Sequence, residues 1–302
     1  MIDLSIILVN HNAKQLTLNC LTSIYERTNV PHEIILVDNA STDDIVGEVR
    51  KSFPHVVIIA NQTNNGFAKA NNQGMEKARG KFIILLNNDT VLKNDALDKM
   101  VAFMETHLEV GALTCKLYDA DGYNIQHNCR SFSAPLGTMF GRASLFTKLF
   151  PSNPWSKNNL LANWDYNSIR EVDWVSGAAL MIRREVFEIV GGLDEDYFMY
   201  WEDTDWCKRI RDAGWQIWFT PDGEIIHFTG QGGGKRSLWL KLLTIYHLHR
   251  SAYLYFRKHY YKNALHPIAI LTFVGMIVLV AVKSVLESVK YIFTRKKPNI
   301  ND

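Results

Sequence analysis

Four short runs of branched apolar residues recur in the first third of the chain, and stretches of helical pattern separate them. The runs are LSIILV, EIILVD, HVVIIA and KFIILL, and helices are expected at residues 14–26, 43–52 and 66–79. Such runs are typical of strands buried on both faces, and their alternation with helices indicates a parallel sheet with right-handed crossovers. The sequence therefore predicts an α/β fold with a Rossmann-like, mostly parallel central sheet flanked by helices.

Polar side chains follow each of these runs, where each predicted strand ends. In a parallel sheet the carboxyl ends of the strands meet at one edge, and ligands bind beyond that edge. One polar group there is typical of a turn or a helix cap, and Ser41, Thr42 and Asp43 are good cap residues. Four groups indicate a binding site, and they comprise Asn10, His11 and Asn12, then Asp38 and Asn39, then Asn61, Asn64, Asn65 and Gly66, and finally Asn87, Asn88 and Asp89.

The common dinucleotide and triphosphate sites are excluded by the glycine pattern. The turn after the first run contains no glycine, which argues against a nicotinamide or flavin enzyme, and the phosphate loop G-x-x-x-x-G-K-[ST] does not occur. An acidic strand end has the wrong sign for binding phosphate directly. If the site holds a diphosphate, Asp89 therefore needs a hard cation, Mg²⁺ or Mn²⁺, that joins its carboxylate to the diphosphate.

Charge is divided unevenly along the chain. Residues 1–234 carry 21 Lys and Arg against 29 Asp and Glu, whereas residues 235–302 carry 12 against 2. A basic tail indicates an acidic partner, either nucleic acid or anionic lipid. The tail also contains the uncharged segment PIAILTFVGMIVLVAV, residues 267–282, and apolar sequence favours an anionic membrane surface. We expect no nucleic-acid partner.

The uncharged segment is short for a membrane crossing. Sixteen helical residues reach roughly 24 Å, less than the ~30 Å hydrocarbon core, and the positive-inside rule keeps both basic flanks on the cytoplasmic side. We expect a re-entrant or interfacial helix, which makes the protein peripheral or monotopic at the cytoplasmic face of the cell membrane. A buried core helix or a homo-oligomer interface is the alternative.

The cysteines and the N-terminus agree with a cytosolic protein. The four cysteines show neither C-x-x-C spacing nor a dense framework, so neither a zinc cluster nor a disulfide scaffold is expected. The first residues, MIDLSIILVN, contain an acidic Asp3 in place of a basic segment, and they do not resemble a secretory signal.

The second half of the chain is less regular before it becomes periodic again. Residues 117–172 hold turn formers such as DADGYN and PSNPWSKNN and are expected to form an insert or a flexible, lid-like region. A helix is expected at residues 203–213, ended by Gly214, with strands near residues 215–219 and 224–228.

Several segments resemble, in the same order, the motifs of family 2 glycosyltransferases, which have the GT-A fold. They are SIILVNHN, EIILVDNASTD, NNGFAKANNQG, FIILLNNDT, VSGAALMIRREVFEIVGGLDEDYFMYWEDTDWCKRIRDAG and IIHFTGQ, over about residues 4–231. Within the family the chain is most similar to the rhamnosyltransferase-like branch that extends bacterial surface polysaccharides on lipid carriers. The resemblance implies a transferase domain at residues 1–234, with a nucleotide-binding half (1–116) and an acceptor and catalytic half (173–234), before the membrane-association region at 235–302.

The resemblance also implies roles for particular residues. Asp203 in WEDTDW matches the catalytic carboxylate, the general base that takes the proton from the acceptor hydroxyl. Asn87-Asn88-Asp89 stands where the family has D-x-D, with Asp89 the metal ligand and Asn87 a neutral departure. Asp38 would bind the nucleoside. Further contacts with the nucleotide sugar are expected from Asn10, Asn12, Asn39, Asn65, Gly66, Asn71, Asn87 and Asn88.

Acceptor contacts are expected from Trp174, Tyr200, Trp201 and Glu202, since aromatic faces suit a sugar ring. The segment GQGGGK would close on the diphosphate, with Lys235 or Arg236 as counter-charge.

Structural roles remain open for several of these residues. Acids in the first turn of a helix, such as Glu202, Asp203 and Asp205, stabilise the helix dipole without any catalysis. Trp206 fits a sugar-binding position and the hydrophobic core equally well. His227 is either a further metal ligand, as in some relatives of the family, or a structural histidine.

The expected function is an inverting, metal-dependent transfer of a sugar from a nucleotide sugar to a polyprenyl-diphosphate-linked saccharide. The first expected donor is dTDP-rhamnose and the second is a UDP-sugar. One alternative is a sugar-1-phosphate nucleotidyltransferase, whose basic glycine-rich loop has no match in VNHNAKQ. The other is a catalytically silent saccharide-binding or assembly protein, against which the joint presence of Asp38, Asp89 and Asp203 argues.

Overall fold

The computed structural model describes residues 2–132, 161, 164–229, 237–261, 263 and 265–295. The chain divides into two compact units. The first comprises Met1–Asp196 and Glu202–Gly233, and the second comprises Tyr197–Trp201 and Gly234–Asp302. The sequence did not indicate that the short segment Tyr197–Trp201 would group with the C-terminal helices.

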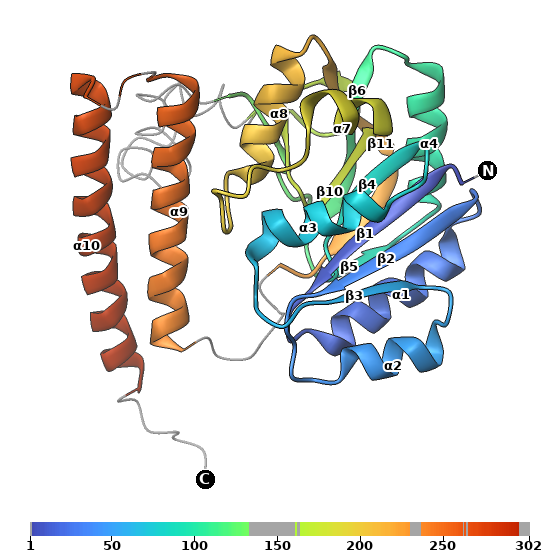
Figure 1. Ribbon diagram of the computed structural model, residues 1–302, viewed down its shortest axis with the longest axis horizontal. Helices are drawn as coiled ribbons and strands as arrows, with labels where there is room; N and C mark the ends of the chain where they lie inside the picture. Colours follow the sequence, from blue (N-terminus) through green and yellow to red (C-terminus); the bar gives the residue numbers. More distant parts are fainter. Residues whose placement is uncertain are drawn as a thin grey trace. The chain divides into compact units, whose positions relative to one another are not determined.

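A mixed β-sheet forms the centre of the first unit (Figure 1), with the strand order β3-β2-β1-β4-β10-β6-β11-β5 and with β8 paired to β11. The strands on the β3 side, up to β4, are parallel, whereas β10 is antiparallel to both of its neighbours and β5 is antiparallel to β11. The bounds are β1 (Leu4–Asn10), β2 (His32–Asp38), β3 (Val57–Ala60), β4 (Phe82–Leu86), β5 (Thr90–Leu92), β6 (Val110–Tyr118), β8 (Arg170–Glu171), β10 (Ala179–Arg183) and β11 (Gln216–His227). A separate two-stranded sheet joins β7 (Cys129–Arg130) to β9 (Trp174–Val175).

Helices cover both faces of the central sheet and make a three-layer unit (Figure 1). One face packs against α1 (Lys14–Arg27), α2 (Ile45–Ser52) and α4 (Ala96–Thr106). The other packs against α3 (Gly66–Lys77), α7 (Arg184–Val190) and α8 (Glu202–Asp212). Because strand side chains alternate, Ile6 and Leu8 of β1 enter the first core and Ile7 enters the second.

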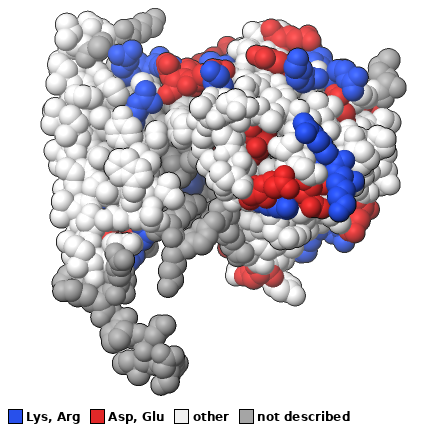
Figure 2. Space-filling model, turned by 60° about the horizontal axis from the view of Figure 1, so that its bottom comes forward, with Lys and Arg blue, Asp and Glu red and all other residues white. Residues whose placement is uncertain are grey.

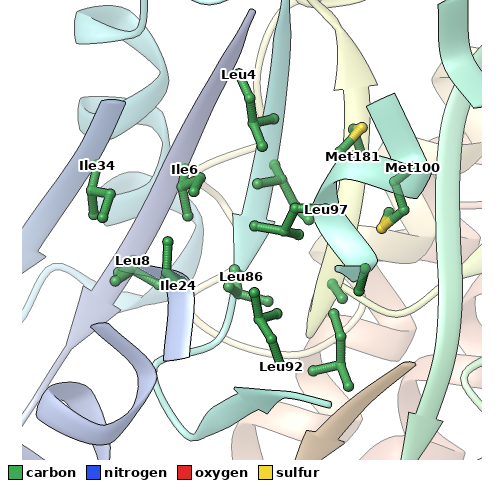
Figure 3. Packing of buried hydrophobic residues seen from close by; sticks show 14 of the residues in the cluster. Leu4, Ile6, Leu8, Ile24, Ile34, Leu86, Leu92, Leu97, Met100 and Met181 are labelled. Carbon is green, nitrogen blue, oxygen red and sulfur yellow. The ribbon is translucent and has the colours of Figure 1, made fainter. Parts of the chain in front are cut away.

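The first core shows how the strand runs hold the unit together (Figure 3). Leu4, Ile6 and Leu8 of β1 lie beside Ile24 of α1 and beside Leu97 and Met100 of α4. Each fully buried Leu or Ile contributes about 1.5–3 kcal/mol relative to its exposed state. Apolar burial of this kind fixes the sheet whose edge carries the polar groups.

The predicted first half of the fold is confirmed. The four apolar runs form β1 to β4, and α1, α2 and α3 begin and end within two residues of the expected bounds. The expectation of burial on both faces is wrong for β3, because this edge strand is partly exposed along its length. The expected caps of α2 are also wrong, since α2 has no side-chain cap and Asp43 accepts instead from the backbone N–H of Lys14 in α1 (2.9 Å).

Two expectations about the second half are corrected. The strands expected near 215–219 and 224–228 form one strand, β11, whose pairing with β6 is irregular between Thr220 and Glu224. Residues 164–172 are not lid-like, because Trp164, Tyr166 and Val172 are buried and Trp164 stacks on Tyr166 with ring centroids 4.1 Å apart. Residues 133–160, 162 and 163, to which the lid expectation also applied, lie outside the described residues.

The second unit is built on an antiparallel pair of helices, α9 (Leu238–His259) and α10 (Pro267–Arg295). Lys241 near the start of α9 pairs with Glu287 near the end of α10 (2.7 Å), and the rings of Tyr253 and Phe273 lie 5.3 Å apart. This helix pair carries the basic and apolar tail that the sequence singled out.

Helix α10 is longer than its uncharged segment. It runs for 29 residues, which is roughly 43 Å, because the helix continues beyond residue 282, so the helix as a whole exceeds a ~30 Å hydrocarbon core. Within the described residues, 267–292 is the one stretch of helix long and apolar enough to cross a membrane. Its side chains are mostly exposed, and the surface of the helix pair in Figure 2 shows few charged groups except near its ends.

Candidate active site

The acidic turn after β4 is brought to His227 by strand pairing. Asp89 immediately precedes β5, and β5 pairs with β11 so that Thr90 lies opposite His227. The backbone N–H of Phe228 donates to the carbonyl oxygen of Asp89 (2.8 Å). His227 Nε2 consequently lies 3.1 Å from Asp89 Oδ1, although the two residues are far apart in the sequence.

The side chain of Asn87 lies beside the contact between Asp89 Oδ1 and His227 Nε2. Its amide nitrogen lies 3.2 Å from His227 Nε2, so it offers an N–H there where a family aspartate would offer an oxygen. The backbone N–H of Asn87 donates to the carbonyl oxygen of Ala178 (2.9 Å), which anchors the turn to the segment before β10.

The donor set at this point fits a cation that is shared with a ligand. Imidazole nitrogen and carboxylate oxygen together suit Mn²⁺, and two neighbouring ligands of an octahedral cation of the size of Mg²⁺ stand about 3 Å apart. In the part of the chain that the structure describes, no group of three His, Cys, Asp or Glu side chains surrounds one point. Asp89 and His227 would therefore leave most coordination positions to diphosphate oxygens and water.

Asn88 does more than shape the turn. Its amide donates to Asn10 Oδ1 (2.9 Å) and to Thr17 Oγ1 (2.8 Å), and Thr17 Oγ1 itself donates to Asn10 Oδ1 (2.8 Å). The Asn10 amide donates to Ser41 Oγ (2.8 Å) and to Asp38 Oδ1 (3.2 Å). This network ties the ends of β1, β2 and β4 into one edge, as the sequence predicted.

A second network lies around Asn39 at the end of β2. The Asn39 amide donates to Asn64 Oδ1 (2.9 Å) and to the carbonyl oxygen of Gly66 (3.1 Å). Its oxygen accepts from the amide of Asn61 (3.2 Å) and from the backbone N–H of Asn65 (3.0 Å). The network fixes the entry to α3, where Gly66 has a φ of 81° that favours glycine.

Three of the asparagines expected to contact the donor have buried side chains. Asn10, Asn39 and Asn71 are at most 2% exposed, and the Asn71 amide donates to the carbonyl oxygen of Phe67 within α3 (2.9 Å). Their amides bind other parts of the protein. We therefore revise their role from direct contact with the donor to support of the site.

The accessible part of this sheet edge lies beside Asp38, in residues 11–12 and 40–42. Asn12 and Ala40 have φ values of 52° and 62°, and such left-handed backbone costs about 1–3 kcal/mol at a residue other than glycine. Asn12 Oδ1 accepts from the backbone N–H of Thr42 (2.8 Å), which holds the two loops together. Asp38 itself is buried, with Oδ2 accepting from the backbone N–H of Ser41 (3.2 Å).

Asp203 lies in the first turn of α8 with a well-defined set of donors. Its Oδ2 accepts from the backbone N–H of Gly177 (3.0 Å), and its Oδ1 accepts from the backbone N–H of Thr204 (2.7 Å). Burial raises the pKa of this carboxyl above its ordinary value, although these hydrogen bonds and the nearby indole N–H of Trp174 act in the opposite direction. The indole N–H of Trp174 forms no hydrogen bond of good geometry within the described residues. A raised pKa suits a general base.

Glu202, the preceding residue, is placed differently. Its side chain is 6% exposed, and its Oε2 has no hydrogen-bond partner among the described residues. Burial, and then the charge of Asp203, raises the pKa of Glu202 well above its ordinary value. A buried carboxyl of this kind does not present itself to an acceptor, which corrects the expected contact.

One short segment connects the Asn87–Asp89 turn with the candidate base. The backbone N–H of Gly177 donates to Asp203, and the carbonyl oxygen of the next residue, Ala178, accepts from Asn87. The segment Ser176–Ala178 therefore sets Asp203 relative to the Asn87–Asp89 turn. Sequence reasoning missed Gly177 and Thr17. The Ser-Gly pair between two strands was the available signal for Gly177, whereas a helix-borne Thr17 carried none.

The remaining expected acceptor residues fall in different places. Trp174 belongs to β9 in the first unit and lies under the guanidinium of Arg130, 5.1 Å from its ring centroid. Tyr200 and Trp201 belong to the second unit, where the Trp201 ring packs 5.2 Å from that of Tyr255. Lys235 and Arg236 lie outside the described residues.

Trp206 is a core residue. It is fully buried, and its indole N–H donates to the carbonyl oxygen of Gly191 (2.8 Å). The structural alternative is therefore the correct one for this tryptophan.

The sheet, the turn after β4 and the carboxylate at the start of α8 define a GT-A glycosyltransferase. The same fold occurs in the mannosyltransferase PcManGT of Pyrobaculum calidifontis, solved in complex with GDP-Man and Mn²⁺, with a TM-score of 0.54 and 17% identity. That likeness covers 98% of this chain and 81% of the other. At such low identity it shows the fold alone.

The sequence comparison is more specific. The family model described as Glycosyl transferase family 2 matches residues 5–188, which is more than half of the chain. The protein therefore belongs to glycosyltransferase family 2 and is a nucleotide-sugar-dependent glycosyltransferase, as its motifs predicted. This membership leaves no support for the nucleotidyltransferase alternative.

Curated relatives carry rhamnosyltransferase names. An N-acetylglucosaminyl-diphospho-decaprenol L-rhamnosyltransferase of Mycobacterium tuberculosis is 28% identical over 226 residues, which cover 71% of this chain and 72% of the relative. The dTDP-rhamnosyl transferase RfbF of Shigella flexneri is 24% identical over 243 residues, which cover 74% and 68%. The likeness to the rhamnosyltransferase branch is thereby confirmed.

Proposed function

We propose that the protein is an inverting, metal-dependent glycosyltransferase that transfers rhamnose from dTDP-rhamnose to a polyprenyl-diphosphate-linked saccharide in surface polysaccharide synthesis. The names of the two relatives support the donor and the acceptor class. The main structural support is that the segment Ser176–Ala178 forms hydrogen bonds with both Asp203 and the Asn87–Asp89 turn, which fixes their arrangement. A UDP-sugar remains the second candidate donor.

The residues divide the reaction between them. Asp203 accepts the proton of the acceptor hydroxyl while that oxygen attacks the anomeric carbon from the face opposite the nucleotide, and the nucleoside diphosphate leaves. Asp38 and the 40–42 loop hold the nucleoside. When bound by Asp89 and His227, the cation would offset the negative charge of the departing diphosphate.

The acceptor class also accounts for the tail. A polyprenyl chain lies in the membrane and its diphosphate lies at the surface, so the enzyme must work at that boundary. Helix α10 offers exposed apolar side chains, and α9 ends in the basic residues Arg257, Lys258 and His259. Apolar area together with positive charge favours an anionic membrane surface, which we propose to be the cytoplasmic face.

A donor screen tests the proposal. The full-length protein is incubated with Mn²⁺ and either dTDP-rhamnose or a panel of UDP-sugars, and its melting temperature is measured. We expect dTDP-rhamnose to give the largest increase and to support transfer to a diphosphate-linked saccharide. Stabilisation and transfer by a UDP-sugar alone would refute the proposed donor.

The variant Asp203→Asn tests the assignment of Asp203 as the general base. Asp203→Asn keeps the size of the side chain, and we expect it to lower turnover by about 10²–10⁴-fold while nucleotide binding persists. Because the deprotonated carboxylate is required, wild-type turnover should fall as the pH drops through a value above the ordinary 3.8 of aspartate. Asp212→Asn, at the exposed other end of α8, is the matched control. Turnover that is indifferent to Asp203→Asn would exclude this residue as the base.

A further inference from the structure

The side chain of Gln126 lies against His227 on the side of the imidazole opposite Asp89. Its amide nitrogen donates to the carbonyl oxygen of His227 (2.9 Å) and to Thr229 Oγ1 (3.1 Å). The backbone N–H of Gln126 donates to the carbonyl oxygen of Leu117 in β6 (2.8 Å), so the residue is anchored independently of its side chain. Neither the motifs nor the expected metal site included this glutamine.

These contacts determine which way the Gln126 amide points. A backbone carbonyl oxygen only accepts hydrogen bonds, so the group that faces the His227 carbonyl must be the amide NH₂. The amide oxygen then faces the imidazole, and Oε1 lies 2.9 Å from His227 Nδ1. An amide oxygen has no hydrogen to give, so the contact with Oε1 requires a proton on Nδ1. Thr229 Oγ1, 3.1 Å from Nδ1, is then a second acceptor for the same proton.

The tautomer has a direct consequence on the other side of the ring. With the proton on Nδ1, the neutral imidazole presents a lone pair at Nε2. That atom lies 3.1 Å from Asp89 Oδ1, which is also an electron-pair donor. The amide N–H of Asn87 also faces Nε2 (3.2 Å), so a cation between Nε2 and Asp89 Oδ1 would replace that N–H as the partner of the lone pair. Metal-binding histidines commonly donate their other ring N–H to a carbonyl or carboxylate oxygen.

We propose that Gln126 is a positioning residue of the metal site, which holds His227 in the Nδ1–H tautomer and aims Nε2 at the cation bound by Asp89. The inference rests on the metal-dependent function proposed above. It assigns to the segment between β6 and β7 a part in cation binding, although Gln126 itself is not a ligand. It also explains why a site with a neutral Asn87 retains a well-oriented pair of ligands.

Binding of Mn²⁺ to the full-length protein tests the inference, with free Mn²⁺ followed by electron paramagnetic resonance in the presence and absence of dTDP. Gln126→Leu removes the acceptor for Nδ1–H, and we expect about 10–100-fold weaker binding. Gln126→Glu keeps an acceptor at that position and should bind within a few-fold of wild type. Gln216→Leu is the matched control, because Gln216 accepts from the ring N–H of Trp218 at the far end of β11 (2.8 Å).

A second measurement reports the tautomer directly. Nitrogen-15 spectra of histidine-labelled protein, with His227 assigned by comparison with His227→Asn, should show Nδ1–H in wild type and in Gln126→Glu, and a shift towards Nε2–H in Gln126→Leu. An Nε2–H tautomer in the wild type would overturn the inference. Unchanged Mn²⁺ affinity in folded Gln126→Leu would overturn it as well.

The two levels of the proposal fail in different ways. If His227→Asn weakens Mn²⁺ binding and Gln126→Leu does not, the result supports the metal site and refutes the positioning role of Gln126. If His227→Asn and Asp89→Asn both bind Mn²⁺ as the wild type does, the result refutes both the metal site and the positioning role of Gln126. The donor screen is independent of both results.

Discussion

Two neighbouring acids at the start of α8 show how local environment separates the roles of similar side chains. Asp203 accepts hydrogen bonds from two backbone N–H groups, which keep its charged form available. Glu202 is buried, and its Oε2 has no partner among the described residues. The first residue suits proton transfer, whereas the second favours the neutral form in the folded protein.

The raised pKa of Glu202 predicts a pH-dependent stability. Its carboxyl binds a proton more tightly in the folded than in the unfolded chain, so its contribution to stability is complete below the ordinary pKa of 4.5 and is lost as the pH rises through the folded value. Glu202→Gln cannot ionise. We therefore expect its melting temperature to exceed that of the wild type by an amount that grows with pH above 4.5.

Thermal melts across this pH range check the prediction, with Glu188→Gln on the exposed face of α7 as control. A difference between Glu202→Gln and wild type that stays constant with pH would contradict it. Asp203 and Asp205 face Glu202 from the same helix and raise its pKa further, so they are kept unchanged in both variants.

The element that positions the chemistry is β4 with the turn that follows it. Beyond Leu86 the chain leaves the core, and hydrogen bonds tie the turn to Ala178 just before β10, to Phe228 just after β11, and to Thr17 in α1. Asn88 contributes the link to α1 and to β1. A turn held from several sides keeps its carboxylate in place without a ligand.

Removal of the Asn88 amide should therefore destabilise the unit. In Asn88→Leu, Asn10 Oδ1 and Thr17 Oγ1 lose a donor in a part-buried site, and we expect a loss of about 1–3 kcal/mol in the free energy of unfolding. Urea denaturation measures this loss. Asn19→Leu, on the exposed face of α1, is the control and should change the free energy by less than about 0.5 kcal/mol. An equal loss of unfolding free energy in the two variants would mean that the Asn88 network does not stabilise the unit more than an exposed side chain does.

At the scale of the whole molecule, the chain combines an acidic first unit with a basic, apolar helix pair. The segment Tyr197–Trp201 packs with α9, where Ser251 Oγ donates to the carbonyl oxygen of Met199 (3.0 Å). Tyr200 and Trp201 have φ values of 71° and 70°, a costly backbone for two successive large residues. This strained segment leads directly into Glu202 and Asp203.

The membrane proposal is tested by charges placed on the exposed face of α10. We expect the double variant Leu271→Lys, Val278→Lys to lose binding to anionic vesicles in a flotation assay, because each lysine in an apolar membrane segment costs about 2.5–3.5 kcal/mol. Leu108→Lys is the matched control, since Leu108 in the first unit is 72% exposed and Leu271 is 75% exposed. Vesicle binding by the double variant at the wild-type level would refute the role of α10.

The local pattern of apolar residues was sufficient to predict the parallel half of the sheet. Runs such as LSIILV and KFIILL specify buried strands through composition and length, and strand polarity then brings Asn10, Asp38 and Asn87 to one edge. The pattern failed where pairing is not local. The antiparallel strand β10 lies between β4 and β6, and no periodicity in the sequence indicates that order.

The sequence by itself determined the fold class, the family motifs and the residue types that can carry the chemistry, because these depend on composition and on neighbours along the chain. Only the tertiary structure decided how these residues are used. It buried Asn10 and Glu202, joined Asp89 to His227 through β5 and β11, and placed Gln126 behind the imidazole. Burial and hydrogen-bond geometry arise from contacts between distant segments, and such contacts exist only after the chain has folded.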